Sequence, residues 1–137
     1  MAGLGAACRV AKGRLKEDFE QNFLLRNRLQ ELLFEGINGL VLNGDVEKRL
    51  PNTLNVSVPG LEGGKILDDL PTIMASTGAA CHDRTIKLSH VLSAMSVPPE
   101  IGMGALRLTL GRSNTMEQIE EAARLIIEQV KGMDGEK

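Results

Sequence analysis

The sequence predicts an α+β domain in which helices cover one side of a mostly antiparallel sheet. Residues 53–58 and 105–110 alternate polar and apolar side chains, as half-buried strands do. Long segments at both ends of the chain instead carry apolar residues at three- and four-residue spacing, which indicates amphipathic helices. With 137 residues, the chain is long enough for one domain around one core.

The first predicted element is a long helix over residues 6–35, with Gly3-Leu4-Gly5 as its lead-in. Gly36 is expected to end this helix as a C-cap. All the aromatic residues of the chain belong to this segment: Phe19, Phe23 and Phe34. We therefore expect this helix to supply the bulk of the core, with its rings packed there.

Two strands are expected next. Residues 37–42 form a short strand that the turn Asn43-Gly44-Asp45 closes. The second strand follows Arg49-Leu50-Pro51-Asn52, and its side chains alternate between an apolar face and a polar one. The apolar face holds Leu54, Val56 and Val58, and the polar face holds Thr53, Asn55 and Ser57.

The second half of the chain alternates helices and strands. We expect a short helix over residues 62–70, a third strand over 71–76 and a helix over 88–95 that Pro98-Pro99 stops. A fourth strand over 105–110 places Leu106, Leu108 and Leu110 on one face, with Arg107 and Thr109 on the other. Thr115 and Gln118 form a capping box for a final helix that ends near Gly132.

Composition excludes several functions. The net charge of -2, the absence of Trp and Tyr and the presence of only three Phe disfavour nucleic-acid binding. No apolar run approaches the length of about 18 residues that a membrane span needs. Cys8 and Cys81 are far apart in a chain without a secretory signal, so we expect free thiols and a cytosolic location.

Cys81 is the candidate nucleophile. It follows the predicted third strand in a stretch of small residues, where Gly78 can adopt a positive φ and turn the chain sharply. Cationic neighbours would lower the pKa of its thiol from about 8.5, and these are His82, Arg84 and Lys87. The alternative is a small buried hydrophobic side chain.

Arg107 is the candidate anchor for an acidic substrate, because a guanidinium binds a carboxylate through two parallel hydrogen bonds. The alternative is an arginine that lies along a solvated sheet face.

His82 is either a base beside Cys81 or a surface histidine. Cys81, His82 and His90 contain ligand atoms, but their spacing matches no zinc pattern, so no metal is expected.

Three segments together resemble the C-terminal part of the class V aminotransferase-like family of cysteine desulfurases and selenocysteine lyases. They are Arg49-Leu50-Pro51-Asn52-Thr53-Leu54-Asn55-Val56-Ser57, Met74-Ala75-Ser76-Thr77-Gly78-Ala79-Ala80-Cys81-His82, and Leu106-Arg107-Leu108-Thr109-Leu110-Gly111-Arg112-Ser113-Asn114-Thr115. The segment around Cys81 is most similar to selenocysteine lyase. The opening residues 2–7 resemble the start of the helix that leads into the family's C-terminal domain.

The resemblance implies the small C-terminal domain of a fold type I, pyridoxal-phosphate-dependent enzyme that removes selenium or sulfur from selenocysteine or cysteine and releases alanine. It implies that Cys81 accepts the chalcogen, that Arg107 binds the substrate α-carboxylate, and that an acceptor protein and a homodimer are the partners. Asn52 lies in the family's Pro-Asn segment, where a structural role is as plausible as an active-site one.

In this family the cofactor-binding lysine belongs to a larger domain that precedes the similar region. None of the seven lysines here has the sequence context of that residue. We therefore expect residues 1–137 to be a single C-terminal domain without the large cofactor-binding domain, with no cofactor-binding residue and no activity alone. The alternative is a cofactor-free binding or regulatory module that retains the fold. A thiol-redox protein is disfavoured because Cys81 has no resolving cysteine nearby.

Overall fold

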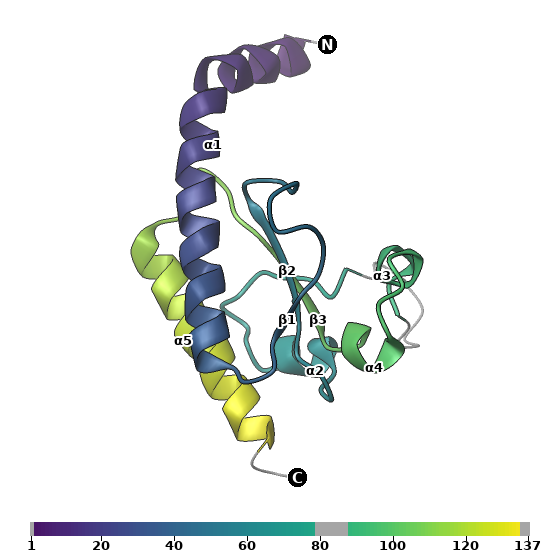
Figure 1. The fold of residues 1–137 in the computed structure, drawn as a ribbon. Coiled ribbons are helices and arrows are strands. Elements are labelled where there is room, and N and C mark those ends of the chain that lie inside the picture. The colour runs from purple at the N-terminus through teal and green to yellow at the C-terminus, as the bar shows by residue number, and fades with distance from the viewer. Residues whose placement is uncertain (1, 79–87, 135–137) are drawn as a thin grey trace.

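The computed structural model describes residues 2–78 and 88–134, and within them the chain forms an α+β fold (Figure 1). The elements are α1 (Ala2–Gly36), β1 (Val41–Leu42), β2 (Thr53–Ser57), α2 (Gly63–Asp68), α3 (His90–Ala94), α4 (Pro99–Gly102), β3 (Ala105–Thr109) and α5 (Met116–Asp134). The strands form an antiparallel sheet in the order β1-β2-β3. The predicted fold class is therefore confirmed.

The two long helices, α1 and α5, lie side by side along one face of the sheet (Figure 1). Their apolar side chains meet Leu54 and Val56 of β2 and Leu106 of β3, all of which are fully buried. The short helix α2 lies near one end of the sheet, and α3 and α4 lie close to each other. The core therefore sits between the sheet and the pair of long helices.

The helix α1 contributes to the core as predicted, but through aliphatic side chains and not through its aromatic ones. Phe19, Phe23 and Phe34 are 52%, 46% and 41% exposed. The core stripe of α1 is instead formed by Leu25, Leu29 and Leu33, at a spacing of four residues. Phe19 and Phe23 stack on each other on a neighbouring face of the helix, with their ring centroids 6.2 Å apart.

Both ends of α1 differ in detail from the prediction. The helix begins at Ala2, so Gly3-Leu4-Gly5 lies inside it rather than before it. It ends at Gly36 as expected, but Gly36 does not have a positive φ. A Cβ at this position would collide with the side chain of Ile127, so the glycine allows α1 and α5 to approach each other closely.

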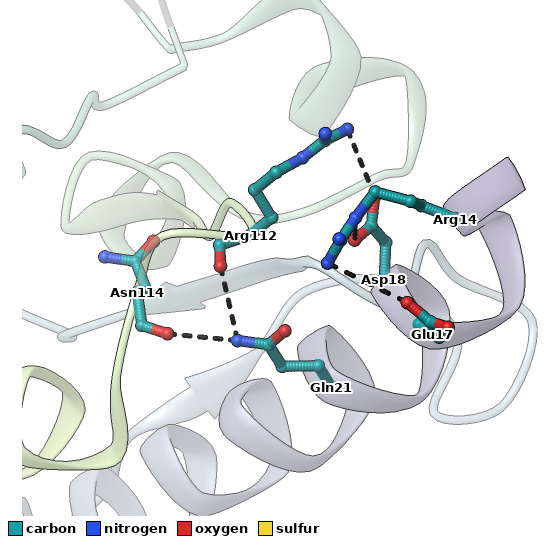
Figure 2. Close-up of polar contacts among 6 residues, drawn as sticks. All are labelled: Arg14, Glu17, Asp18, Gln21, Arg112 and Asn114. Carbon is teal, nitrogen blue, oxygen red and sulfur yellow. Dashed lines mark hydrogen bonds and ion pairs between the residues drawn. The ribbon is translucent and has the colours of Figure 1, made fainter. Parts of the chain in front are cut away.

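A polar cluster ties the middle of α1 to the turn between β3 and α5 (Figure 2). The guanidinium of Arg112 lies 3.1 Å from the carboxylate of Asp18, which also pairs with Arg14 of the same helix. The side-chain amide of Gln21 donates hydrogen bonds to the carbonyl oxygens of Arg112 and Asn114. Asp18 lies four residues before Asn22, the first buried residue of α1.

Two predicted strands are largely absent. The segment 37–42 pairs only at β1, because the Ile37 N–H still bonds helically to the Leu33 carbonyl and Gly39 then turns with a φ of 73°. The segment 71–76 is not a strand, although Ser76 forms one isolated bridge. Its start is a turn, in which the Ile73 N–H donates to the Leu70 carbonyl.

The remaining elements follow the prediction more closely. Helices expected over 62–70 and 88–95 appear as the shorter α2 and α3. The helix α4 was not predicted; Pro99 occupies its first turn, where a missing N–H does no harm. The capping box at the start of α5 is confirmed, because the Thr115 and Gln118 backbone N–H groups bond to each other's side chains. None of the described helices is long and apolar enough to cross a membrane.

Candidate active site on the open face of the sheet

Arg107 lies in the middle of β3 with an exposed side chain, between the buried Leu106 and Leu108. The predicted alternation is therefore confirmed. Because α1 and α5 cover the leucine face, Arg107 points to the opposite, open face of the sheet. Within the described residues, its guanidinium forms no ion pair.

On the outer edge of β3, Arg107 pairs with Ser76. The Arg107 N–H donates to the Ser76 carbonyl at 2.6 Å, and the Ser76 N–H donates back at 3.3 Å. Two residues later, Gly78 has the predicted positive φ, 83°, and its N–H donates to the Ser76 hydroxyl. Cys81 and His82 follow within residues 79–87, which lie outside the described residues.

On the inner edge, Arg107 faces Asn55 of β2. The ladder hydrogen bonds at the two ends of this strand pair join Leu110 to Asn52 and Val58 to Gly104. Because such bonds occur at every second pair of an antiparallel ladder, Asn55 and Arg107 form a non-hydrogen-bonded pair. The side chains of such a pair point to the same face and approach each other most closely.

The side chain of Asn55 is held by Asn43. The buried Asn43 donates from its amide nitrogen to the Asn55 amide oxygen at 2.8 Å and to the Ser57 hydroxyl at 2.8 Å. The Asn43 backbone N–H also donates to the Asn55 carbonyl. The Asn55 amide oxygen is thus occupied, and its NH₂ group has no acceptor within the part of the chain that the structure describes. Sequence reasoning placed Asn55 on a polar face but missed its position opposite Arg107.

Asn52 joins the ends of β2 and β3. Its amide nitrogen donates to the Leu110 carbonyl at 3.1 Å, and its own carbonyl accepts from the Leu110 N–H at 2.8 Å. Its amide oxygen accepts from the Thr53 hydroxyl. Of the two roles expected for Asn52, these contacts support the structural one.

Other candidate features lie away from this face. A groove of about 450 Å³ runs between residues 72–74, the end of β3 and α5, but Arg107 does not line it. His90 is exposed at the start of α3, and Cys8 is an exposed free thiol on α1. No group of three or more metal-ligating side chains occurs among the residues that the structure describes.

The described lysines are all exposed: Lys12, Lys16, Lys48, Lys65 and Lys131. Lys65 pairs with Glu62 of the preceding turn at 3.0 Å. A lysine that binds pyridoxal phosphate covalently needs a desolvated amine beside the substrate site. The described residues therefore do not by themselves fit this cofactor.

No family model matches the sequence, but curated proteins and solved structures similar to it are found. Cysteine desulfurase IscS of Neisseria meningitidis serogroup A is 36% identical over 129 residues, which are 92% of this chain and 31% of that protein. The IscS protein of Vibrio cholerae is 34% identical over 126 residues, with the same shares. The chain thus spans about a third of the length of these relatives and matches their C-terminal part.

Solved structures give the same result. A NifS-like protein from Rickettsia africae ESF-5 superposes with a TM-score of 0.81 at 25% identity, covering 95% of this chain and 34% of that one. Another NifS-like protein superposes with a TM-score of 0.75 at 30% identity, covering 89% of this chain and 30% of that one. The chain therefore belongs to the cysteine desulfurase family of IscS and NifS-like proteins, as a counterpart of their C-terminal part.

Proposed function

We propose that this chain is the substrate-anchoring and chalcogen-accepting domain of a pyridoxal-phosphate-dependent cysteine desulfurase or selenocysteine lyase. Arg107 binds the α-carboxylate of cysteine or selenocysteine, and Cys81 takes the sulfur or selenium atom. The observation that supports this proposal is the bridge between Arg107 and Ser76, because the segment that carries Cys81 starts there. Five residues of extended chain reach at most about 18 Å, which sets an upper limit on the distance from Ser76 to Cys81.

The proposed reaction balances without an external oxidant. The substrate chalcogen forms a bond to the Cys81 sulfur while its bond to the substrate β-carbon breaks. That carbon gains a hydrogen and two electrons and leaves as alanine, while the transferred atom, oxidised by two electrons, remains on Cys81 as a persulfide or perselenide. Pyridoxal phosphate, when bound, supplies the electron sink for this cleavage.

The chain contributes orientation and a nucleophile. The guanidinium fork of Arg107 holds the carboxylate through two parallel hydrogen bonds, which fixes the end of the substrate opposite the chalcogen. The cofactor lysine is expected in the part of the relatives that this chain does not cover. We therefore expect the 137-residue chain alone to release no alanine. The homodimer, the acceptor protein and the cytosolic location stay predictions.

A fusion tests the role of Arg107. Residues 1–137 replace the matched C-terminal part of the N. meningitidis enzyme, and alanine release is measured with cysteine and with selenocysteine. Arg107→Lys keeps the charge but loses the paired hydrogen bonds, so kcat/KM should fall roughly ten- to a hundredfold at unchanged Tm. Arg112→Lys, at an exposed arginine that pairs with Asp18, is the control and should change kcat/KM little.

The competing role for Arg107 is packing along the sheet. It predicts that Arg107→Lys lowers the Tm while the folded fusion keeps its kinetics, and that result would contradict the proposal.

Cys81→Ser in the same fusion removes the acceptor. Mass spectrometry of the parent fusion should find one added sulfur or selenium on Cys81 after a single turnover, and finding it on another residue would overturn the acceptor assignment.

A further inference from the structure

We propose that Asn55 is a second binding residue for the carboxylate that Arg107 holds, and that its side-chain NH₂ group donates a hydrogen bond to it. The proposal rests on the proposed function, because it takes Arg107 as the carboxylate anchor. Its consequence is that this pair of side chains binds a carboxylate more tightly than the neutral amide of the same amino acid.

The register of the sheet brings the two side chains together. Asn55 and Arg107 are cross-strand partners, and the backbone N–H and carbonyl of Arg107 are both used on the other edge by Ser76. The Asn55–Arg107 pair is thus a non-hydrogen-bonded one, with its side chains as near neighbours on the open face. Asn55 is half-buried and Arg107 is exposed, so the face is accessible to a small ligand.

The orientation of the Asn55 amide is set by Asn43. Both amide protons of Asn43 are used, one on the Asn55 oxygen and one on the Ser57 hydroxyl, and both Asn43 and Ser57 are buried. With Asn43 in this orientation, a reversed Asn55 amide would turn its NH₂ toward the NH₂ of Asn43, so Asn43 directs the Asn55 oxygen toward itself and the Asn55 NH₂ away from it. Asn43 is therefore a positioning residue, and within the described residues the Asn55 NH₂ has no acceptor.

Arg107 and Asn55 together present only hydrogen-bond donors to a ligand. A carboxylate offers about four lone-pair positions, of which a bidentate guanidinium uses two, so an asparagine N–H can take another. An amide group offers one oxygen, and its NH₂ would meet the donors of Arg107 or Asn55. Replacing a carboxylate by an amide therefore loses acceptors and leaves donors unpaired.

The test uses the ¹⁵N-labelled 137-residue chain and side-chain NMR resonances. L-Alanine is the probe, because it carries the carboxylate without a thiol, and L-alaninamide at matched ionic strength is its control. Alanine should shift the Asn55 Nδ2–H₂ and Arg107 Nε–H resonances along one common binding curve. Alaninamide should shift neither.

Variants test the contact independently. Asn55→Ala should weaken alanine binding about tenfold, as expected for one hydrogen bond to a charged group. Asn55→Asp should abolish binding, because it places a carboxylate opposite Arg107. Asn43→Ala should alter the Asn55 side-chain resonances before ligand is added and weaken binding less than Asn55→Ala. Thr109→Val, on the same face of β3, is the control and should leave binding unchanged.

The outcomes separate this inference from the function on which it rests. If alanine shifts Arg107 but not Asn55, the Asn55 contact is wrong and the Arg107 anchor stands. If neither residue responds, the anchor itself is wrong. Equal shifts with alaninamide would overturn carboxylate selection. The measurement on the unmodified chain decides these cases even if a variant fails to fold.

Discussion

Arg107 is held at both edges of its strand, by Ser76 on one side and by the cross-strand partner Asn55 on the other. Such pairing fixes the face of the sheet from which the side chain projects before any substrate binds. At the residue scale, the proposed site therefore depends on backbone pairing as much as on the identity of its side chains.

A prediction for single residues concerns the thiols of Cys8 and Cys81. Cys8 is exposed on α1, so an alkylating reagent can reach it. We expect iodoacetamide to label Cys81 faster at pH 7, because the cations near it in sequence raise its thiolate fraction.

Peptide mass spectrometry of a labelling time course measures both rates in one sample. The variants Cys8→Ser and Cys81→Ser confirm the assignment of each rate. Equal rates at neutral pH would show that the neighbours of Cys81 do not activate it.

At the scale of single elements, α1 buries a charge without a carboxylate partner among the described residues. Arg26 is 2% exposed, lies 5.0 Å from the centre of the Phe23 ring and makes one long hydrogen bond to the Leu50 carbonyl. Its Nε atom is buried and has no hydrogen-bond partner among the residues that the structure describes. Burial and the nearby guanidinium of Arg49 lower the pKa of Arg26, so the charged form is disfavoured there.

We predict that Arg26→Met stabilises the chain by about 1 kcal/mol, because it keeps much of the stem volume and removes an unpaired buried charge. Urea unfolding followed by circular dichroism measures the change. Arg28→Met, two residues along the same helix at a more exposed position, should change stability by less than about 0.5 kcal/mol. A loss of stability in Arg26→Met would mean that this charge contributes more through its contacts than its burial costs.

At the scale of the whole molecule, the two halves of α1 differ. Its buried residues begin at Asn22, and its polar ties to the turn after β3 involve Asp18 and Gln21 (Figure 2). The earlier turns of α1 extend beyond the rest of the fold (Figure 1). Helical segments without tertiary packing are marginal in water, and each interior glycine costs about 1 kcal/mol relative to alanine.

We therefore predict that amides of residues 2–13 exchange with deuterium in seconds, while those of 22–36 are protected close to the global unfolding limit. Hydrogen exchange read by mass spectrometry tests this, and residues 116–134 of α5 serve as the protected reference. Equal protection along all of α1 would show that its first turns pack against something else in solution.

Local signals account for the parts of the fold that were predicted well. The alternation around Arg107, the capping box of Thr115 and Gln118 and the positive φ of Gly78 each depend on a few neighbouring residues. Side chains alternate along a strand and caps bind adjacent amides whatever the rest of the chain does. The same locality let the sequence indicate Arg107 and Cys81 as candidate site residues.

The sequence by itself therefore determined the fold class, most of the elements and the two candidate residues. The tertiary structure alone decided which stripe of α1 enters the core, that residues 71–76 pair only at Ser76, and that Asn55 faces Arg107. Each of these depends on partners far away in the chain. Periodicity gives the face on which a residue lies, but a strand needs a neighbour and a register, and a helix face needs a surface to cover.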